Sequence, residues 1–213
     1  GLFICASFLK SFFAKEKKAL KISLGFSLII LTLFQAWWGS MVVATNIVPW
    51  VLTVHMVIAA LMIGWQILII SVWKNSLEII PKKLKIICFF GLIFFLFQII
   101  LGTQVRQIVD QWIDYNLREE LRLLDFNLFL SHRSLALFLV IYSFIIGGFM
   151  VLKKIHLIEI YLFFFCVLLE AVVGKILADY NLPIFFQPMH LILAMICFGC
   201  LAGVLVNYKT ESN

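Results

Sequence analysis

Long stretches of apolar residues alternate with short polar segments along the whole chain. A helix needs about 20 apolar residues to cross the hydrocarbon core of a bilayer, where unpaired backbone is too costly for irregular structure. The pattern therefore predicts helical membrane spans, and residues 1–13 are interpreted as the end of one more span. The predicted full spans are residues 22–44, 50–73, 86–109, 131–152, 157–178 and 188–207.

The composition supports an all-α, polytopic membrane protein. The chain is 64% hydrophobic and 13% charged, whereas soluble domains are about 45–50% apolar and about 25% charged. Its mean hydropathy is +1.10, and a soluble fold of this size cannot bury so large an apolar fraction. The lipid bilayer is therefore its expected surrounding. We interpret the net charge of +6 as lysines flanking the spans, so no nucleic-acid partner is expected.

Lysine residues cluster in every second polar segment between the spans, and these connecting segments are called joints below. Cytoplasmic loops carry an excess of Lys and Arg, so these joints are predicted to be cytoplasmic. The acidic joints are predicted to face outward from a bacterial inner membrane. The longest of them, residues 110–130, is amphipathic and is expected to carry a short interfacial helix. The lysine-rich joints contain Lys10, Lys15, Lys17, Lys18, Lys21, Lys74, Lys82, Lys83, Lys85, Lys153, Lys154 and Lys209.

The chain contains an internal repeat. Residues 35–64 align without a gap on residues 170–199 when the chain is shifted by 135 residues. The shift equals four spans with their loops, so the two units keep one orientation and predict two pseudo-repeated four-helix bundles. The identical pairs are Ala36 and Ala171, Gly39 and Gly174, Asn46 and Asn181, His55 and His190, Ala59 and Ala194, and Gly64 and Gly199.

The first of these bundles is predicted to be incomplete. Residues 1–80 are assigned to its remainder, and residues 81–213 to the second bundle. The same shift places the counterpart of His132 just upstream of Gly1. We therefore expect the protein to extend upstream, with the first span, the loop after it and the start of the second span in that region.

Histidines are the most informative polar residues in the spans, because ionisable groups there are rare and usually functional. His55, His132 and His190 each lie near the start of a span that runs inward, so they share one depth near the outer face. A lone histidine in a span is more often a hydrogen-bonded packing residue. Three at one depth, two of them repeat-related, favour iron ligands. His156 lies beside the cytoplasmic lysines and is interpreted as an ordinary interfacial residue.

The second bundle contains the predicted haem site. His132 and His190 come from its second and fourth spans, and facing helices of a bundle can supply two axial imidazoles to one haem. Near the outer ends of spans, Arg106, Arg133 and Lys175 are candidates to pair with the anionic haem propionates. Basic side chains at span ends also simply reach for lipid headgroups, and this alternative stays open.

The remaining polar and cysteine residues suggest no site. Cys197 and Cys200 form a CxxC, but no second pair accompanies it, so packing is favoured over zinc binding. Glu170 lies within a span and aligns with Gln35, and the sequence shows a partner for neither.

Several segments resemble the haem A synthase family. They are GSMVVATNIVPWVLTVH, LGTQVRQ, SHR, an Asn–Leu–Pro stretch and QPMHLILA, in that order. The resemblance covers essentially the whole chain, and the ordered set with its repeat is more specific than any single motif. It implies an eight-span fold of two bundles. It also implies an oxidoreductase that oxidises a methyl group of haem O to the formyl group of haem A, for cytochrome oxidase assembly.

The resemblance also implies ligands and partners. The second bundle would hold haem b through His132 and His190. The first bundle would hold the substrate haem O, with His55 as a ligand of its iron. Haem O synthase and an electron donor are the expected partners. The family's proposed catalytic glutamate precedes a histidine upstream of Gly1, so the catalytic residues stay unknown, and a chain beginning at Gly1 is expected to be inactive alone. The outer cysteine pairs of Gram-positive members have no counterpart in residues 110–130.

Two other functions are compatible with the sequence. A diheme b-type cytochrome would have the same histidine pairs but would only transfer electrons. A non-catalytic membrane transporter or structural protein would use the histidines for packing, and internal repeats are common in transporters. The depth of the histidines argues against the transporter, because transporter sites lie near the middle of the membrane.

Overall fold

Helices dominate the structure, a computed structural model that describes residues 2–46, 48–74, 78–115, 127–180 and 182–210. Within these ranges six helices are long and apolar enough to cross a membrane, which confirms the six predicted spans. A shorter helix, α1 (Leu2–Ser11), occupies the segment interpreted as the end of a further span. The long helices are α2 (Lys18–Ala44), α3 (Pro49–Lys74), α4 (Lys82–Tyr115), α5 (Asn127–Lys153), α6 (Ile158–Asp179) and α7 (Phe186–Asn207).

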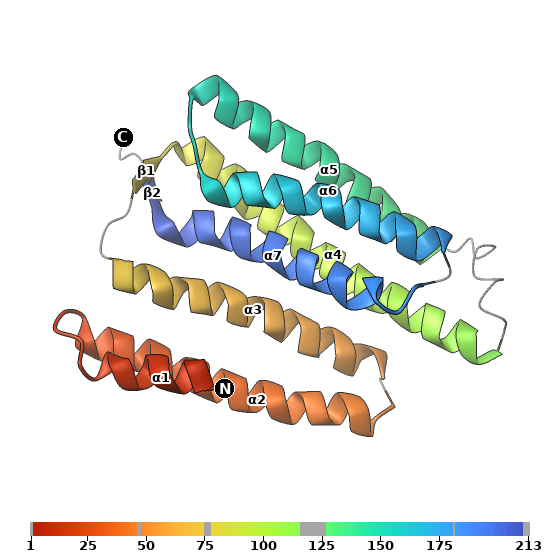
Figure 1. Cartoon of the computed structure of the whole chain (residues 1–213), viewed down its shortest axis with the longest axis horizontal. Coiled ribbons are helices and arrows are strands. Elements are labelled where there is room, and N and C mark those ends of the chain that lie inside the picture. The colour runs from red at the N-terminus through yellow and green to blue at the C-terminus, as the bar shows by residue number, and fades with distance from the viewer. Residues whose placement is uncertain (1, 47, 75–77, 116–126, 181, 211–213) are drawn as a thin grey trace.

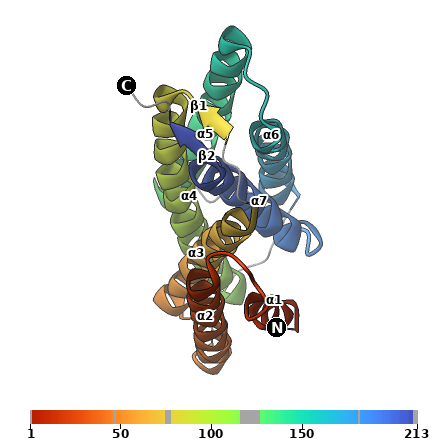
Figure 2. The ribbon, with the colours of Figure 1, turned by 90° about the vertical axis from the view of Figure 1, so that its left-hand side faces the viewer.

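The long helices lie side by side along the longest axis of the molecule (Figure 1). Helices α4, α5, α6 and α7 form a closed ring in which each contacts two others, and this ring corresponds to the predicted second bundle. Helix α3 packs against α4 and α7, α2 packs against α3, and α1 lies beside α2 (Figure 2). The division into two repeated bundles at residue 80 stays a prediction.

The segment after α4, where a short interfacial helix was expected within residues 110–130, is described only in part. Residues 110–115 continue α4, and α5 begins at Asn127. The rest of the joint, residues 116–126, lies outside the described residues. The apolar run thus predicts where a span exists better than where its helix ends, because the backbone hydrogen bonds continue into polar flanks.

A short parallel pair of strands, which the sequence did not predict, closes the opposite end. Strand β1 (Glu78–Ile80) pairs with β2 (Tyr208–Thr210), directly after α7. The ammonium of Lys85 donates to the carbonyl of Tyr208 at 2.8 Å, and the Tyr208 hydroxyl donates to Glu159 at 3.0 Å. Burial, and then the nearby Glu159 carboxylate, raises the pKa of Tyr208 to about 12, so this hydroxyl keeps its proton.

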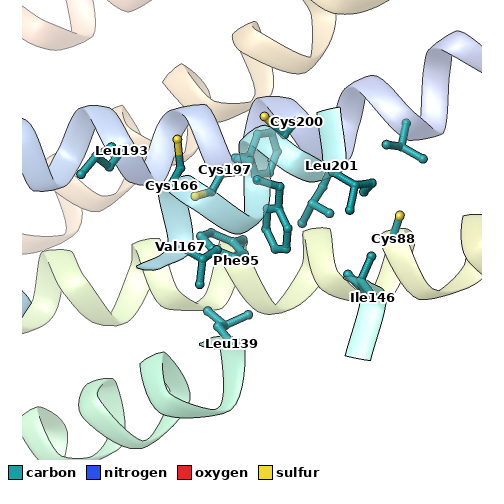
Figure 3. Packing of buried hydrophobic residues seen from close by; sticks show 14 of the residues in the cluster. Cys88, Phe95, Leu139, Ile146, Cys166, Val167, Leu193, Cys197, Cys200 and Leu201 are labelled. Atoms are coloured by element: carbon teal, nitrogen blue, oxygen red, sulfur yellow. The ribbon is translucent and has the colours of Figure 1, made fainter. Parts of the chain in front are cut away.

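The core lies inside the ring of four helices (Figure 3). Phe163 of α6 is fully buried and meets Phe95 of α4 edge-on, with ring centroids 5.5 Å apart. All five cysteines are free, and only Cys5 is exposed, as the packing interpretation expected. Many large apolar side chains elsewhere on the long helices are exposed, which suits a protein whose outer surface contacts lipid.

Replacing Phe163 by alanine should destabilise the protein by about 3 to 5 kcal/mol, because a buried aromatic side chain leaves a cavity. The matched control is Phe165→Ala on the same helix, where the side chain is 58% exposed. The control should stay within about 0.5 kcal/mol of wild type. Denaturant unfolding in detergent micelles measures both variants, and equal losses would contradict the packing described here.

Candidate functional site

Each of the three span histidines packs its ring edge against a glycine on the preceding helix. A Cβ added at Gly39 of α2 would lie 3.1 Å from Cε1 of His55 on α3. The equivalent distance is 3.3 Å from Gly102 of α4 to His132 of α5. From Gly174 of α6 to His190 of α7 it is 3.2 Å. Small residues let membrane helices approach closely, and here the glycine makes room for an imidazole.

A polar side chain lies one helical turn before each of these glycines. Gln35 donates from Nε2 to the backbone carbonyl of His55 at 2.8 Å, and Gln98 donates in the same way to His132 at 3.2 Å. In the third case the polar residue is Glu170, whose Oε1 lies 3.2 Å from Nδ1 of His190. The recurring unit is therefore a Gln or Glu, then a Gly four residues later, then a His on the next helix.

The structure brings His132 and His190 together. Their ring centroids are 6.4 Å apart, and the ring planes differ by 72°. Two imidazoles that bind one metal ion from opposite sides have centroids roughly 6 Å apart, because each metal–nitrogen bond is about 2 Å long. The observed separation therefore matches an axial pair on one iron.

Unpaired polar atoms surround these rings. Nδ1 of His55, His132 and His190 is buried and makes no hydrogen bond within the described chain, and the same holds for Oε1 of Gln35 and Gln98. Buried polar atoms in folded proteins nearly always have partners. The burial of these imidazoles and the separation of the two rings together fit a metal-centred planar group held by His132 and His190.

His55 lies apart from this pair, in an open groove of about 1090 Å³. The groove runs between α2 and α3 on one side and α6 and α7 on the other, and Ile4 of α1 also lines it. Its walls are mostly aliphatic, with Gln35 beside the histidine. A cavity of this size is large enough for an extended, mainly apolar small molecule.

Comparison with known families identifies the kind of protein. The family model described as COX15-CtaA, cytochrome oxidase assembly protein, matches residues 1–202. The chain belongs to this family. Comparisons with curated proteins and with solved structures gave no match. The protein is thus a multi-pass membrane protein of cytochrome oxidase assembly, and the resemblance found in the sequence is confirmed at the level of the family.

The basic residues of this assembly protein lie at the surface. Arg106 of α4 donates from its guanidinium to Oε1 of Gln187, which connects α4 to the beginning of α7. The guanidinium carbon of Arg133 lies 5.6 Å from the ring centre of Phe129. Lys175 is highly exposed and forms an ion pair with Asp179 at 2.7 Å. The role of these residues toward propionates stays a prediction, and for Lys175 it would require the ion pair to open.

Sequence reasoning found the histidines but missed the residues that hold them. Gln98, and the partners of Gln35 and Glu170, became visible only when neighbouring helices were placed side by side. A signal was nevertheless present, because the spacing of four residues between a Gln or Glu and a Gly occurs before each of the three histidine-bearing helices. His156, interpreted as interfacial, is exposed and pairs with Tyr161 at 2.7 Å.

Replacing Gly174 by alanine should give no gain in stability, although alanine favours a helix over glycine by about 1 kcal/mol. The added methyl group would press on His190 at 3.2 Å. The control is Gly148→Ala on α5, where nothing lies within 4 Å of the new Cβ. Gly148→Ala should be stabilising in detergent unfolding, and an equal gain at Gly174 would contradict the close contact.

Proposed function

We propose that the protein is a haem A synthase that oxidises a methyl group of haem O to a formyl group for cytochrome oxidase. The proposal rests above all on the His132–His190 pair, whose ring centroids are 6.4 Å apart. Family membership supports a role in cytochrome oxidase assembly. In this proposal haem b binds between α5 and α7, and the substrate haem O binds at His55.

The groove at His55 supports the placement of the substrate. Its aliphatic walls suit a porphyrin, which is large, flat and mainly apolar. The imidazole of His55 would bind the substrate iron, and Gln35 would hold the helix that carries this imidazole through its bond to the His55 carbonyl. The hydroxyls of Thr53 and Thr103 lie 2.8 Å apart and connect α3 to α4. Thr103 directly follows Gly102, the glycine next to His132.

The protein's own contribution is binding, orientation and exclusion of water. A bound haem supplies redox chemistry that amino-acid side chains lack. His132 and His190 would hold haem b, with their rings placed by Gly102 and Gly174. Arg106 and Arg133, at the outer ends of their helices, would pair with propionates, since guanidinium groups match carboxylates well.

The proposal also gives the protein an orientation in the bacterial inner membrane. The lysine-rich joints would face the cytoplasm of a bacterium, and the haem sites would lie near the outer leaflet of the inner membrane. Haem O would reach the protein from a haem O synthase, and an electron donor would complete the oxidation. The proposal is supported by the His132–His190 pair and by family membership, and not by any of these partners.

Loss of either axial histidine should abolish the bound haem. The full-length gene product, purified in detergent, should show the visible spectrum of a low-spin haem with two histidine ligands. His132→Ala and His190→Ala should each lose that spectrum, because one imidazole cannot hold the iron from both sides. His156→Ala is the matched control, since His156 is exposed, and should keep it. Retention of the wild-type spectrum in His132→Ala would contradict the assignment.

Activity is tested by producing the full-length protein together with a haem O synthase in a host that makes no haem A. Chromatography of the extracted haems should reveal haem A or its hydroxylated intermediate. Protein present in the membrane without either product would overturn the enzyme proposal. A two-histidine spectrum without product would favour the electron-transferring diheme cytochrome instead.

A further inference from the structure

The three histidine units are alike except in one atom-level detail. In the first and second units an amide, from Gln35 or Gln98, contacts the backbone carbonyl of the histidine. In the second unit the amide also lies 3.5 Å from Nε2 of His132. In the third unit the polar side chain is a carboxyl, that of Glu170, and it lies 3.2 Å from Nδ1 of His190. Residues 35 and 170 occupy equivalent positions of the repeat. The carboxyl therefore distinguishes the α6–α7 unit within a shared design.

Glu170 is placed to act on His190, whose Nδ1 lies 3.2 Å from its carboxyl. Its side chain is 17% exposed and that of His190 is 27% exposed. Oε1 lies 3.2 Å from Nδ1 without forming a hydrogen bond, and Oε2 is buried without a partner. A rotation of the imidazole is the movement that would align the two groups.

We propose that Glu170 is the positioning residue of His190, and that its carboxyl makes this imidazole the stronger electron donor of the axial pair. The inference rests on the proposed haem site. It goes beyond that site because it makes His190 a stronger electron donor than His132, whereas the prediction from sequence assigned both histidines the same role.

The physical reason lies in the free nitrogen of the ring. When one imidazole nitrogen binds a metal, the other carries a proton and needs an acceptor, and a carboxylate there fixes the ring and raises its basicity. A more basic axial ligand favours ferric over ferrous iron and so lowers the reduction potential of the haem. Gln98 does not supply this effect to His132, because it is an uncharged amide, although it lies 3.5 Å from Nε2 of that ring as well as donating to the backbone carbonyl at 3.2 Å.

The surroundings of the pair strengthen the expected effect. The carboxyl and the ring lie in an apolar bundle, where a charge-assisted hydrogen bond is stronger than in water. Gly174, one turn after Glu170 on α6, leaves room for the ring edge, since a Cβ added there would lie 3.2 Å from Cε1 of His190.

Redox titration of the purified, haem-loaded full-length protein tests the inference. Glu170→Gln keeps the shape of the side chain but replaces the carboxyl by an amide. The ratio of reduced to oxidised haem at a fixed potential should rise about tenfold, which for one electron is about 59 mV. Glu170→Ala should in addition release haem more readily, because the ring loses its polar contact.

Glu159→Gln is the matched control. Glu159 also lies on α6, about three turns away, and it accepts a hydrogen bond from Tyr208 rather than from a histidine. The control makes the same replacement of a carboxyl by an amide, but far from the histidine. A local effect of Glu170 on His190 therefore predicts that the control leaves the haem potential near that of wild type.

The outcomes separate this inference from the proposed function. Wild-type protein without a two-histidine haem would overturn the haem site itself. A wild-type haem whose potential moves equally in Glu170→Gln and Glu159→Gln, or in neither, would overturn the role of Glu170 alone. If Glu170→Gln does not accumulate, Glu170→Asp withdraws the acceptor by one methylene while keeping the charge. It should also raise the potential, and an unchanged value would contradict the inference.

Discussion

Imidazole rings inside a membrane bundle impose the constraint on which the rest of this structure depends. A polar ring in an apolar helix pair needs both space and partners. Glycine on the preceding helix supplies the space for His55, His132 and His190, and a Gln or Glu one turn earlier supplies the polar contact. The spacing of these residues fixes the register of each helix pair, so the site and the packing of the bundle are determined together.

The arrangement of the helices explains why two of the three histidines lie close together. Helices α4 to α7 close into a ring with a well-packed interior, so α5 and α7 face each other and bring His132 and His190 to a centroid separation of 6.4 Å. Helix α3 lies outside that ring and carries His55 to a groove instead. A half-buried pair of histidines would suit a resident haem, and an open groove would suit an exchangeable porphyrin.

The sequence was sufficient for the spans, because apolar length is a property of one segment at a time. Polar rarity likewise singled out the histidines, whose role as iron ligands stays a prediction. The sequence was insufficient for the partners of Glu170 and Gln35, because those contacts depend on the relative register of two helices. The pairing of β1 with β2 also joins segments that are far apart in the chain. The sequence also placed the end of α4 too early, because its backbone hydrogen bonds continue through residues 110–115 into the polar flank. The interfacial helix expected in residues 110–130 stays a prediction, since residues 116–126 lie outside the described residues.

Cryo-electron microscopy of the haem-loaded full-length protein would test the central claim most directly. The account predicts density for one planar porphyrin between α5 and α7, with the imidazoles of His132 and His190 as its two axial ligands. The absence of a porphyrin between these two helices, or one there that leaves either ring without a bond to iron, would contradict it.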